Sequence, residues 1–157
     1  GILVDADFAG TTQHSGFILR RKQITDLLAK SGYVITPMPG SGDPPGERFF
    51  HPDGHAPIGL FIMPNHNDDG MLEDILKGMI DAVPYTVVFQ HAKGVVQALE
   101  NKLFDDRLHI SKAEIGTFLA WQKRPPAEIK ACISSKIFNV GTPAGNLLKR
   151  WLEDVFV

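Results

Sequence analysis

A strand–helix–strand pattern over residues 1–36 leaves few folds open to this chain. Residues 1–6 form a short, continuous apolar run that ends in polar residues, which is typical of a buried strand. Residues 15–31 predict a helix, because apolar side chains recur on one face and Gly32 can end the helix in a left-handed conformation. Residues 33–36 predict a second strand. This spacing indicates a βαβ unit and a mostly parallel sheet flanked by helices.

A Pro- and Gly-rich segment, residues 37–57, predicts a loop with a hairpin. Its segment Arg48-Phe49-Phe50 can pair with a third strand at residues 58–63 across the turn Pro52-Asp53-Gly54. The remaining apolar periodicity predicts five helices, at residues 71–80, 86–103, 111–124, 127–137 and 142 onward. The helix at 111–124 would begin at a capping box, Ser111-Lys112-Ala113-Glu114.

These elements predict an α/β fold of one domain. Its length of 157 residues suits a single domain, and an apolar content of 43% can supply a core. We expect an α/β part at residues 1–83 and an all-helical part at 84–157 that packs on the sheet. Because the chain opens directly within an apolar strand, we also expect a further N-terminal strand upstream of Gly1.

The net charge and the cysteine content limit which binding partners and which cellular compartment we expect for this chain. The net charge is −2 and the pI about 6.3, so a nucleic-acid partner would be held by a local patch or through a metal rather than by bulk charge. The candidate patches are Arg20-Arg21-Lys22, Lys123-Arg124 and Lys149-Arg150, and an ordinary solvated helix surface is the favoured explanation for each. The single cysteine excludes an intrachain disulfide and fits a cytoplasmic setting. No apolar run approaches the roughly 20 residues of a membrane span.

Asp5 and Asp7 follow the first predicted strand and form the strongest chemical signal. Residues two apart in a strand share a face, and α/β proteins bind ligands at the carboxyl ends of parallel strands. Two carboxylates about 4 Å apart repel by about 4 kcal/mol at an effective dielectric of about 20. Mg²⁺ or Mn²⁺ would relieve that repulsion through oxygen ligands. The alternative is that one aspartate caps the next helix and the other is solvated.

A second acidic cluster follows the third strand, over residues 68–74. Glu73 would complete the metal site with Asp5 and Asp7, and Asp69 and Asp74 would lie in a second shell around it. Acids at a helix N-terminus are also favoured by the helix dipole alone, which leaves a structural explanation open.

Two alternative interpretations, a zinc site and a phosphatase, rest on weaker sequence patterns than the Asp5 and Asp7 motif. A candidate zinc site consists of His51 and His55 in the loop and His66 after the third strand, but these residues match no recognised ligand spacing. A haloacid-dehalogenase-type phosphatase also starts with a strand and a DxD motif. That family places Thr or Val two residues after the second Asp, where this chain has Ala9.

The order of these motifs resembles a bacterial family with a Toprim-like fold. The matching segments are Gly1-Ile2-Leu3-Val4-Asp5-Ala6-Asp7, Ile62-Met63-Pro64-Asn65, Gly70-Met71-Leu72-Glu73-Asp74, Phe118-Leu119-Ala120-Trp121-Gln122 and Trp151-Leu152. Toprim domains of topoisomerases, primases and OLD-type nucleases bind Mg²⁺ through a first-strand glutamate and a DxD. The resemblance implies that Asp5 and Asp7 are the DxD and that Glu73 is the later acid, while the first-strand glutamate has no counterpart.

The resemblance therefore implies Mg²⁺-dependent phosphodiester or phosphoryl-transfer chemistry, nuclease-like or primase-like, on nucleic acid or a nucleotide. The alternative is a catalytically silent Toprim-like module that binds a partner. A Glu-Gly-x-x-Asp segment upstream would favour the enzyme.

Overall fold

The computed structural model describes residues 1–10, 16–36, 46–125 and 127–156. They form two compact units: Gly1–Leu72 together with Leu147–Val157, and Glu73–Asn146. The boundary expected near residue 84 thus differs from the observed division, which returns the last eleven residues of the chain to the α/β unit. Whether the units behave as one domain stays a prediction.

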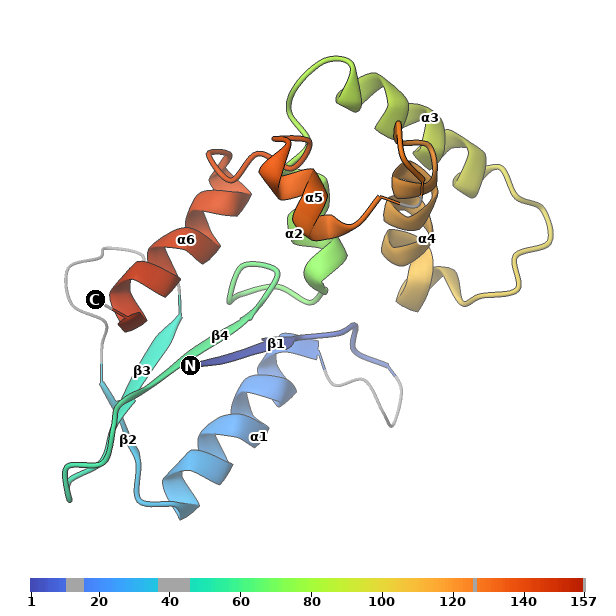
Figure 1. The fold of residues 1–157 in the computed structure, drawn as a ribbon. Coiled ribbons are helices and arrows are strands. Elements are labelled where there is room, and N and C mark those ends of the chain that lie inside the picture. Colours follow the sequence, from blue (N-terminus) through green and yellow to red (C-terminus); the bar gives the residue numbers. More distant parts are fainter. Residues whose placement is uncertain (11–15, 37–45, 126, 157) are drawn as a thin grey trace. The chain divides into compact units, whose positions relative to one another are not determined.

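The first unit contains a four-stranded mixed sheet (Figure 1). Its strands lie in the order β1-β4-β3-β2, and only β1 and β4 pair in parallel among them. The strands are β1 Ile2–Asp5, β2 Val34–Thr36, β3 Glu47–Phe50 and β4 Ile58–Met63. The α/β class is confirmed, but the expectation of a mostly parallel sheet is wrong. The reason is the predicted hairpin, which is confirmed: the short connection from β3 to β4 makes that pair antiparallel.

Helix α1 (Gly16–Lys30) follows β1, as predicted, but it does not lead to a strand beside β1. β2 pairs with β3 instead, at the far edge of the sheet from β1. The loop predicted over residues 37–57 is described only from residue 46, and residues 37–45 lie outside the described part of the chain.

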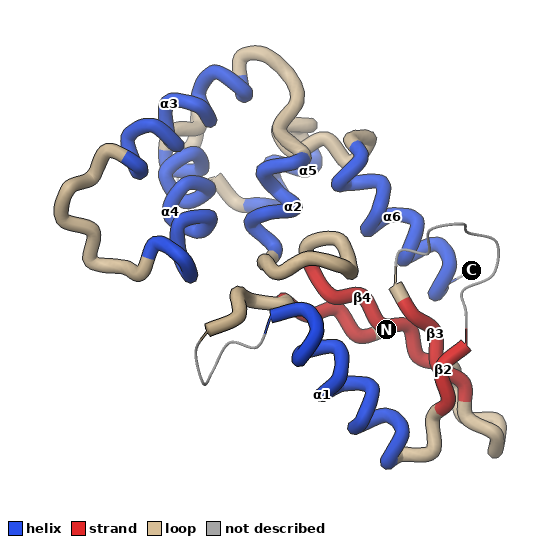
Figure 2. Tube along the Cα trace, turned by 180° about the vertical axis from the view of Figure 1, so that it is seen from behind, coloured by secondary structure: helices blue, strands red, loops and turns tan. Residues whose placement is uncertain are grey.

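Both faces of β4 are covered, which explains its continuous apolar sequence. Leu60 and Ile62 point toward a core that includes Leu28 of α1. Phe61 points to the opposite face, where its ring centroid lies 5.6 Å from that of Trp151. Trp151 belongs to α6 (Pro143–Phe156), and Figures 1 and 2 show α1 and the end of α6 on opposite sides of the sheet.

The second unit is helical, as the sequence predicts for the chain after Pro84. Phe118 is fully buried, with its ring centroid 5.8 Å from that of Phe89 and 6.1 Å from that of Phe138. The helices that contribute to this unit are α2 Leu72–Gly78, α3 Tyr85–Gln97, α4 Asp106–Ala120, α5 Ile129–Ser134 and the start of α6. No helix in the described part of the chain has the length and apolar character needed to cross a membrane.

Helix α4 corrects the capping prediction. The helix begins at Asp106, and the side chain of Asp105 caps it by accepting a hydrogen bond from Arg107 N at 2.9 Å. Ser111 lies inside the helix and is buried, so its hydroxyl cannot cap the helix start. Ser111 and Glu114 instead lie on the same face of α4, where both contact Lys77, and this shared contact accounts for the Ser-x-x-Glu pattern.

Candidate metal-binding carboxylates after the first strand

The parallel pairing of β1 with β4 brings the segments that follow these strands to one edge of the sheet. Asp5, the last residue of β1, is in register with Met63, the last residue of β4. The ladder continues for one more residue, because Ala6 N donates to Met63 O at 3.1 Å. The carboxyl ends of parallel strands are the usual ligand-binding edge of an α/β sheet.

Asp5 lies against the segment that leads into α2. Its Oδ1 accepts a hydrogen bond from Leu72 N at 2.8 Å, although the two residues are 67 positions apart in the chain. The side chain is half-buried. The predicted location of Asp5 beside the loop after the third strand thus agrees with this contact, and Asp5 also stabilises the start of α2 by satisfying a free backbone N–H.

Asp7 is oriented differently from what strand periodicity predicts. Its backbone adopts a left-handed conformation with φ of 60° and pairs with Gly70 through hydrogen bonds of 2.8 and 3.1 Å. Its Oδ2 accepts a hydrogen bond from Arg20 Nη2 of α1 at 2.9 Å. Because β1 ends at Asp5, the rule that residues two apart share a face does not extend to Asp7.

Asp69 connects the loop after β4 to the start of α1. Its Oδ1 accepts from Phe17 N at 2.7 Å, and its Oδ2 accepts from Ala9 N at 3.1 Å. The carboxylate packs so closely on Gly16 that a Cβ there would lie 2.7 Å from Oδ1. Asp69 therefore acts as a helix cap supplied from a distant part of the chain.

Glu73 and Asp74 belong to the second unit, so their place in a shared site with Asp5 and Asp7 stays a prediction. Glu73 lies half-buried in the first turn of α2. Asp74 accepts a hydrogen bond from Ser111 Oγ at 2.6 Å, and its Oδ1 lies 3.6 Å from Lys77 Nζ.

This contact belongs to a partly buried polar network between α2 and α4 that sequence reasoning missed. Lys77 Nζ lies 2.7 Å from Ser111 Oγ and 2.7 Å from Glu114 Oε2. Glu114 is 2% exposed, and its other oxygen accepts from Gln97 Nε2 at 3.1 Å. A buried carboxylate needs such partners to offset its lost hydration, so the network explains why an acid is tolerated among packed helices.

A second missed group lies in the first unit and joins Glu47, His66 and Arg21. Arg21 donates to Glu47 Oε1. His66 Nδ1 accepts from Ile62 N at 3.0 Å, so the proton of the neutral ring is on Nε2, which lies 3.9 Å from Glu47 Oε2. Burial, with a smaller effect from the Arg21 charge, lowers the pKa of His66 to about 4. No spacing in the sequence signals this group, since its members come from β3, α1 and the loop after β4.

Asp5 and Asp7 offer only carboxylate oxygens, the donor type that hard cations prefer over soft ones. A carboxylate has about four lone-pair sites, so one that accepts a backbone N–H can still coordinate a metal. Mg²⁺ typically binds one or two protein carboxylates and completes its shell with water and substrate phosphates. Asp5 and Asp7 fit that donor set.

Comparison with known proteins assigns the family. No curated protein and no solved structure matches the chain. A family model matches residues 1–157, the full length of the chain. The chain therefore belongs to the family described as "Protein of unknown function (DUF3226)".

Proposed function

We propose that this protein is a Toprim-like phosphoryl-transfer protein that uses Mg²⁺ or Mn²⁺ at Asp5 and Asp7 and acts on phosphodiester or nucleotide substrates. The observation that supports the proposal is the position of both aspartates at the carboxyl edge shared by β1 and β4. Glu73 is the proposed third acid, as the family resemblance implies.

The metal would supply charge stabilisation to phosphate oxygens and to a leaving oxygen. Asp5 and Asp7 would hold it through carboxylate oxygens. Leu72 N holds the carboxylate of Asp5, and the pairing with Gly70 holds the backbone of Asp7, so both proposed ligands are restrained by the protein. Fixed ligands favour binding because less conformational freedom is lost when the metal arrives.

Arg20 is the proposed phosphate-binding residue of the same site. Its guanidinium contacts Asp7, and its side chain is 29% exposed, so solvent reaches it. A planar guanidinium can donate two parallel hydrogen bonds to a phosphate group. A metal on Asp7 would weaken the attraction between Asp7 and Arg20, which would leave Arg20 able to turn toward a phosphate.

A catalytically silent binding module is the second candidate, and one observation favours it. Asp5, Asp7 and Asp69 each accept a hydrogen bond from the protein itself, which explains three acids at this edge without a metal. In that case the edge would be a structural junction between β1, α1 and the loop after β4.

Thermal melting with chelator and with millimolar Mg²⁺ or Mn²⁺ tests the metal site. A ligand present at 100 times its dissociation constant stabilises the folded protein by about 2.7 kcal/mol. We expect a metal-dependent rise in Tm for the wild type that is lost in Asp5→Asn and Asp7→Asn. Asp26→Asn, which changes an exposed acid of α1, is the matched control and should keep the full rise.

Failure of the metal to raise the Tm of the wild type would overturn the proposal. If the metal binds but no cleavage or transfer is seen on single-stranded DNA, RNA or nucleoside triphosphates, the binding module is supported. Metal-dependent turnover that is lost in Asp7→Asn supports the enzyme.

A further inference from the structure

We propose that His51, Asp53 and His55 form a Zn²⁺ site on the turn between β3 and β4. This site differs from the Asp5 and Asp7 edge, because the turn precedes the first residue of β4 whereas Asp5 is in register with Met63, the last residue of β4. Among the described residues of the first unit, these three side chains each offer one ligand atom, and the three atoms lie within 4.8 Å of one another.

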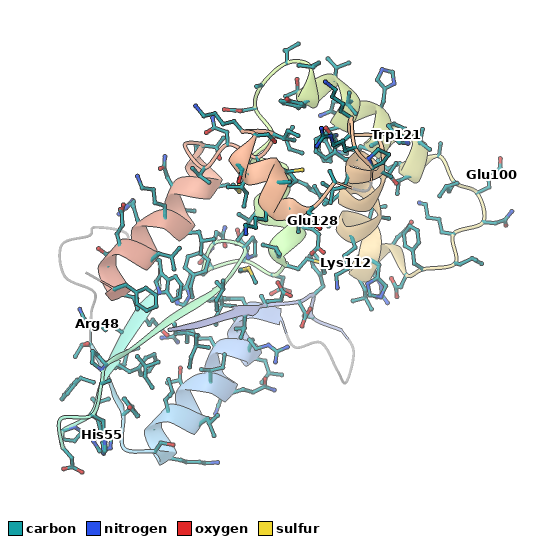
Figure 3. All side chains as sticks on the ribbon, viewed as in Figure 1. Arg48, His55, Glu100, Lys112, Trp121 and Glu128 are labelled. Carbon is teal, nitrogen blue, oxygen red and sulfur yellow. The ribbon has the colours of Figure 1, made fainter. Side chains whose placement is uncertain are left out.

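The turn itself brings the ligands together. Gly54 N donates to His51 O at 3.0 Å, and Gly54 adopts a left-handed φ of 80°, which reverses the chain within the segment His51-Pro52-Asp53-Gly54-His55. The ring centroids of His51 and His55 are 4.4 Å apart, and His51 Nδ1 lies 3.8 Å from Asp53 Oδ2. Figure 3 labels His55 at this connection between β3 and β4.

His51 is held in the orientation that a metal ligand requires. Its Nε2 lies 3.1 Å from Ser31 O, and since a carbonyl only accepts, the ring proton is on Nε2 and the lone pair is on Nδ1. That lone pair faces Asp53. Metal-binding histidines commonly donate their other ring N–H to a backbone carbonyl, which fixes tautomer and ring orientation.

The residues that follow α1 support the same ring. Tyr33 packs edge-on against His51 with ring centroids 5.1 Å apart. Gly32 leaves room for the imidazole, because a Cβ at this position would collide with His51 Nε2. His51 is therefore positioned by contacts outside the turn, whereas Asp53 is 82% exposed and His55 is also exposed, so both can move to close on an ion.

The donor set favours Zn²⁺ over Mg²⁺. Two imidazole nitrogens with one carboxylate match the ligand types of zinc, while Mg²⁺ prefers oxygen ligands. Zinc bond lengths of about 2.0–2.1 Å require ligand atoms about 3.3 Å apart in a tetrahedron, so the observed group must contract modestly. Asp53 N, which donates to His51 Nδ1 at 3.2 Å, would give up that contact. Three protein ligands leave a fourth position for water or an external ligand.

Chelator-competition titration of the metal-free protein with ZnCl₂ tests the site. We expect the wild type to bind one Zn²⁺ per chain. Binding should be weaker by about tenfold or more in His55→Gln and in Asp53→Asn. Because the side chains of His55 and Asp53 are exposed, these two substitutions should leave folding unaffected. His91→Gln, which removes an exposed histidine of the second unit, should bind as tightly as the wild type. The visible absorption spectrum of bound Co²⁺ should change in His55→Gln, because that variant removes one of the two nitrogen ligands.

Three results would overturn the site. These are no stoichiometric Zn²⁺ binding by the wild type, a Zn²⁺ affinity in His55→Gln and Asp53→Asn equal to that of the wild type, or displacement of Zn²⁺ by equimolar Mg²⁺. Asp7→Asn should bind Zn²⁺ normally, so failure here is distinguishable from failure of the proposed Mg²⁺ site.

Discussion

Arg20 Nη2 donates a hydrogen bond to Asp7 Oδ2 at 2.9 Å, and this pair joins α1 to the residue that lies two positions beyond β1. The pair changes the electrostatics of the aspartate motif, because a guanidinium already offsets the negative charge that a metal would otherwise have to balance. It also corrects the view of Arg20-Arg21-Lys22 as a solvated surface. Arg20 contacts Asp7 and Arg21 contacts Glu47, while Lys22 pairs with Asp26 at the exposed surface.

The ion pair predicts that Asp7→Asn lowers the free energy of unfolding in the absence of metal by about 1 kcal/mol. Asn suits the left-handed backbone at position 7 as well as Asp does, so the loss reports the charge rather than strain. Urea unfolding of wild type, Asp7→Asn, Arg20→Met and the double variant measures the coupling. Additive effects of the two single changes would show that the pair contributes nothing.

The capping role of Asp69 predicts that Asp69→Ala costs about 1–2 kcal/mol of stability, because Phe17 N and Ala9 N both lose their acceptor. Asp69→Asn should cost roughly half as much, since only one oxygen remains to accept. Asp68→Ala on the same exposed loop is the control, and we expect a smaller loss. Thermal or urea unfolding distinguishes these variants, and equal costs at positions 68 and 69 would contradict the cap.

The contact between Gly59 and Val155 predicts a size-dependent coupling between β4 and α6. A Cβ at Gly59 would collide with Val155 Cγ2, so Gly59→Ala should destabilise the fold by about 1–3 kcal/mol. The added change Val155→Ala should recover much of that loss. Gly94→Ala is the matched control, because a Cβ on that residue of α3 meets open space and should stabilise the helix slightly. No recovery in the double variant would exclude the proposed collision.

The buried His66 predicts a pH-dependent stability in the acid range. Its pKa is about 4 in the folded protein against 6.5 for the unfolded chain, so the unfolded state binds the extra proton between these values. The contribution of the neutral His66 ring to the free energy of unfolding is therefore fully present above pH 6.5. This contribution falls by up to about 3 kcal/mol as the pH drops toward 4.

The variant His66→Asn tests this dependence, because Asn tolerates the left-handed backbone at φ of 59° and does not titrate. The difference in unfolding free energy between wild type and variant should change with pH only between 6.5 and 4. His91→Asn should leave the wild-type profile intact. A constant difference between wild type and His66→Asn would contradict the lowered pKa.

The sequence by itself determined the local elements and the chemistry available to the chain. Continuous apolar runs located β1 and β4, the Pro52-Asp53-Gly54 turn predicted the hairpin, and periodic apolar positions located the helices. These signals are local, since strand and helix periodicity and turn preferences act over a few residues. The position of Asp5 at a strand end also followed from the sequence alone.

Only the tertiary structure decided which strands are neighbours and which polar groups meet. The placement of β4 between β1 and β3 made the sheet mixed. The partners Arg20–Asp7, Asp69–Phe17 and Lys77–Glu114 come from separate elements and leave no periodic trace. His51, Asp53 and His55 are close in sequence, yet the contact with Ser31 that orients His51 depends on where α1 ends. Pairing of charged and hydrogen-bonding groups depends on distance and desolvation in three dimensions, which residue spacing does not encode.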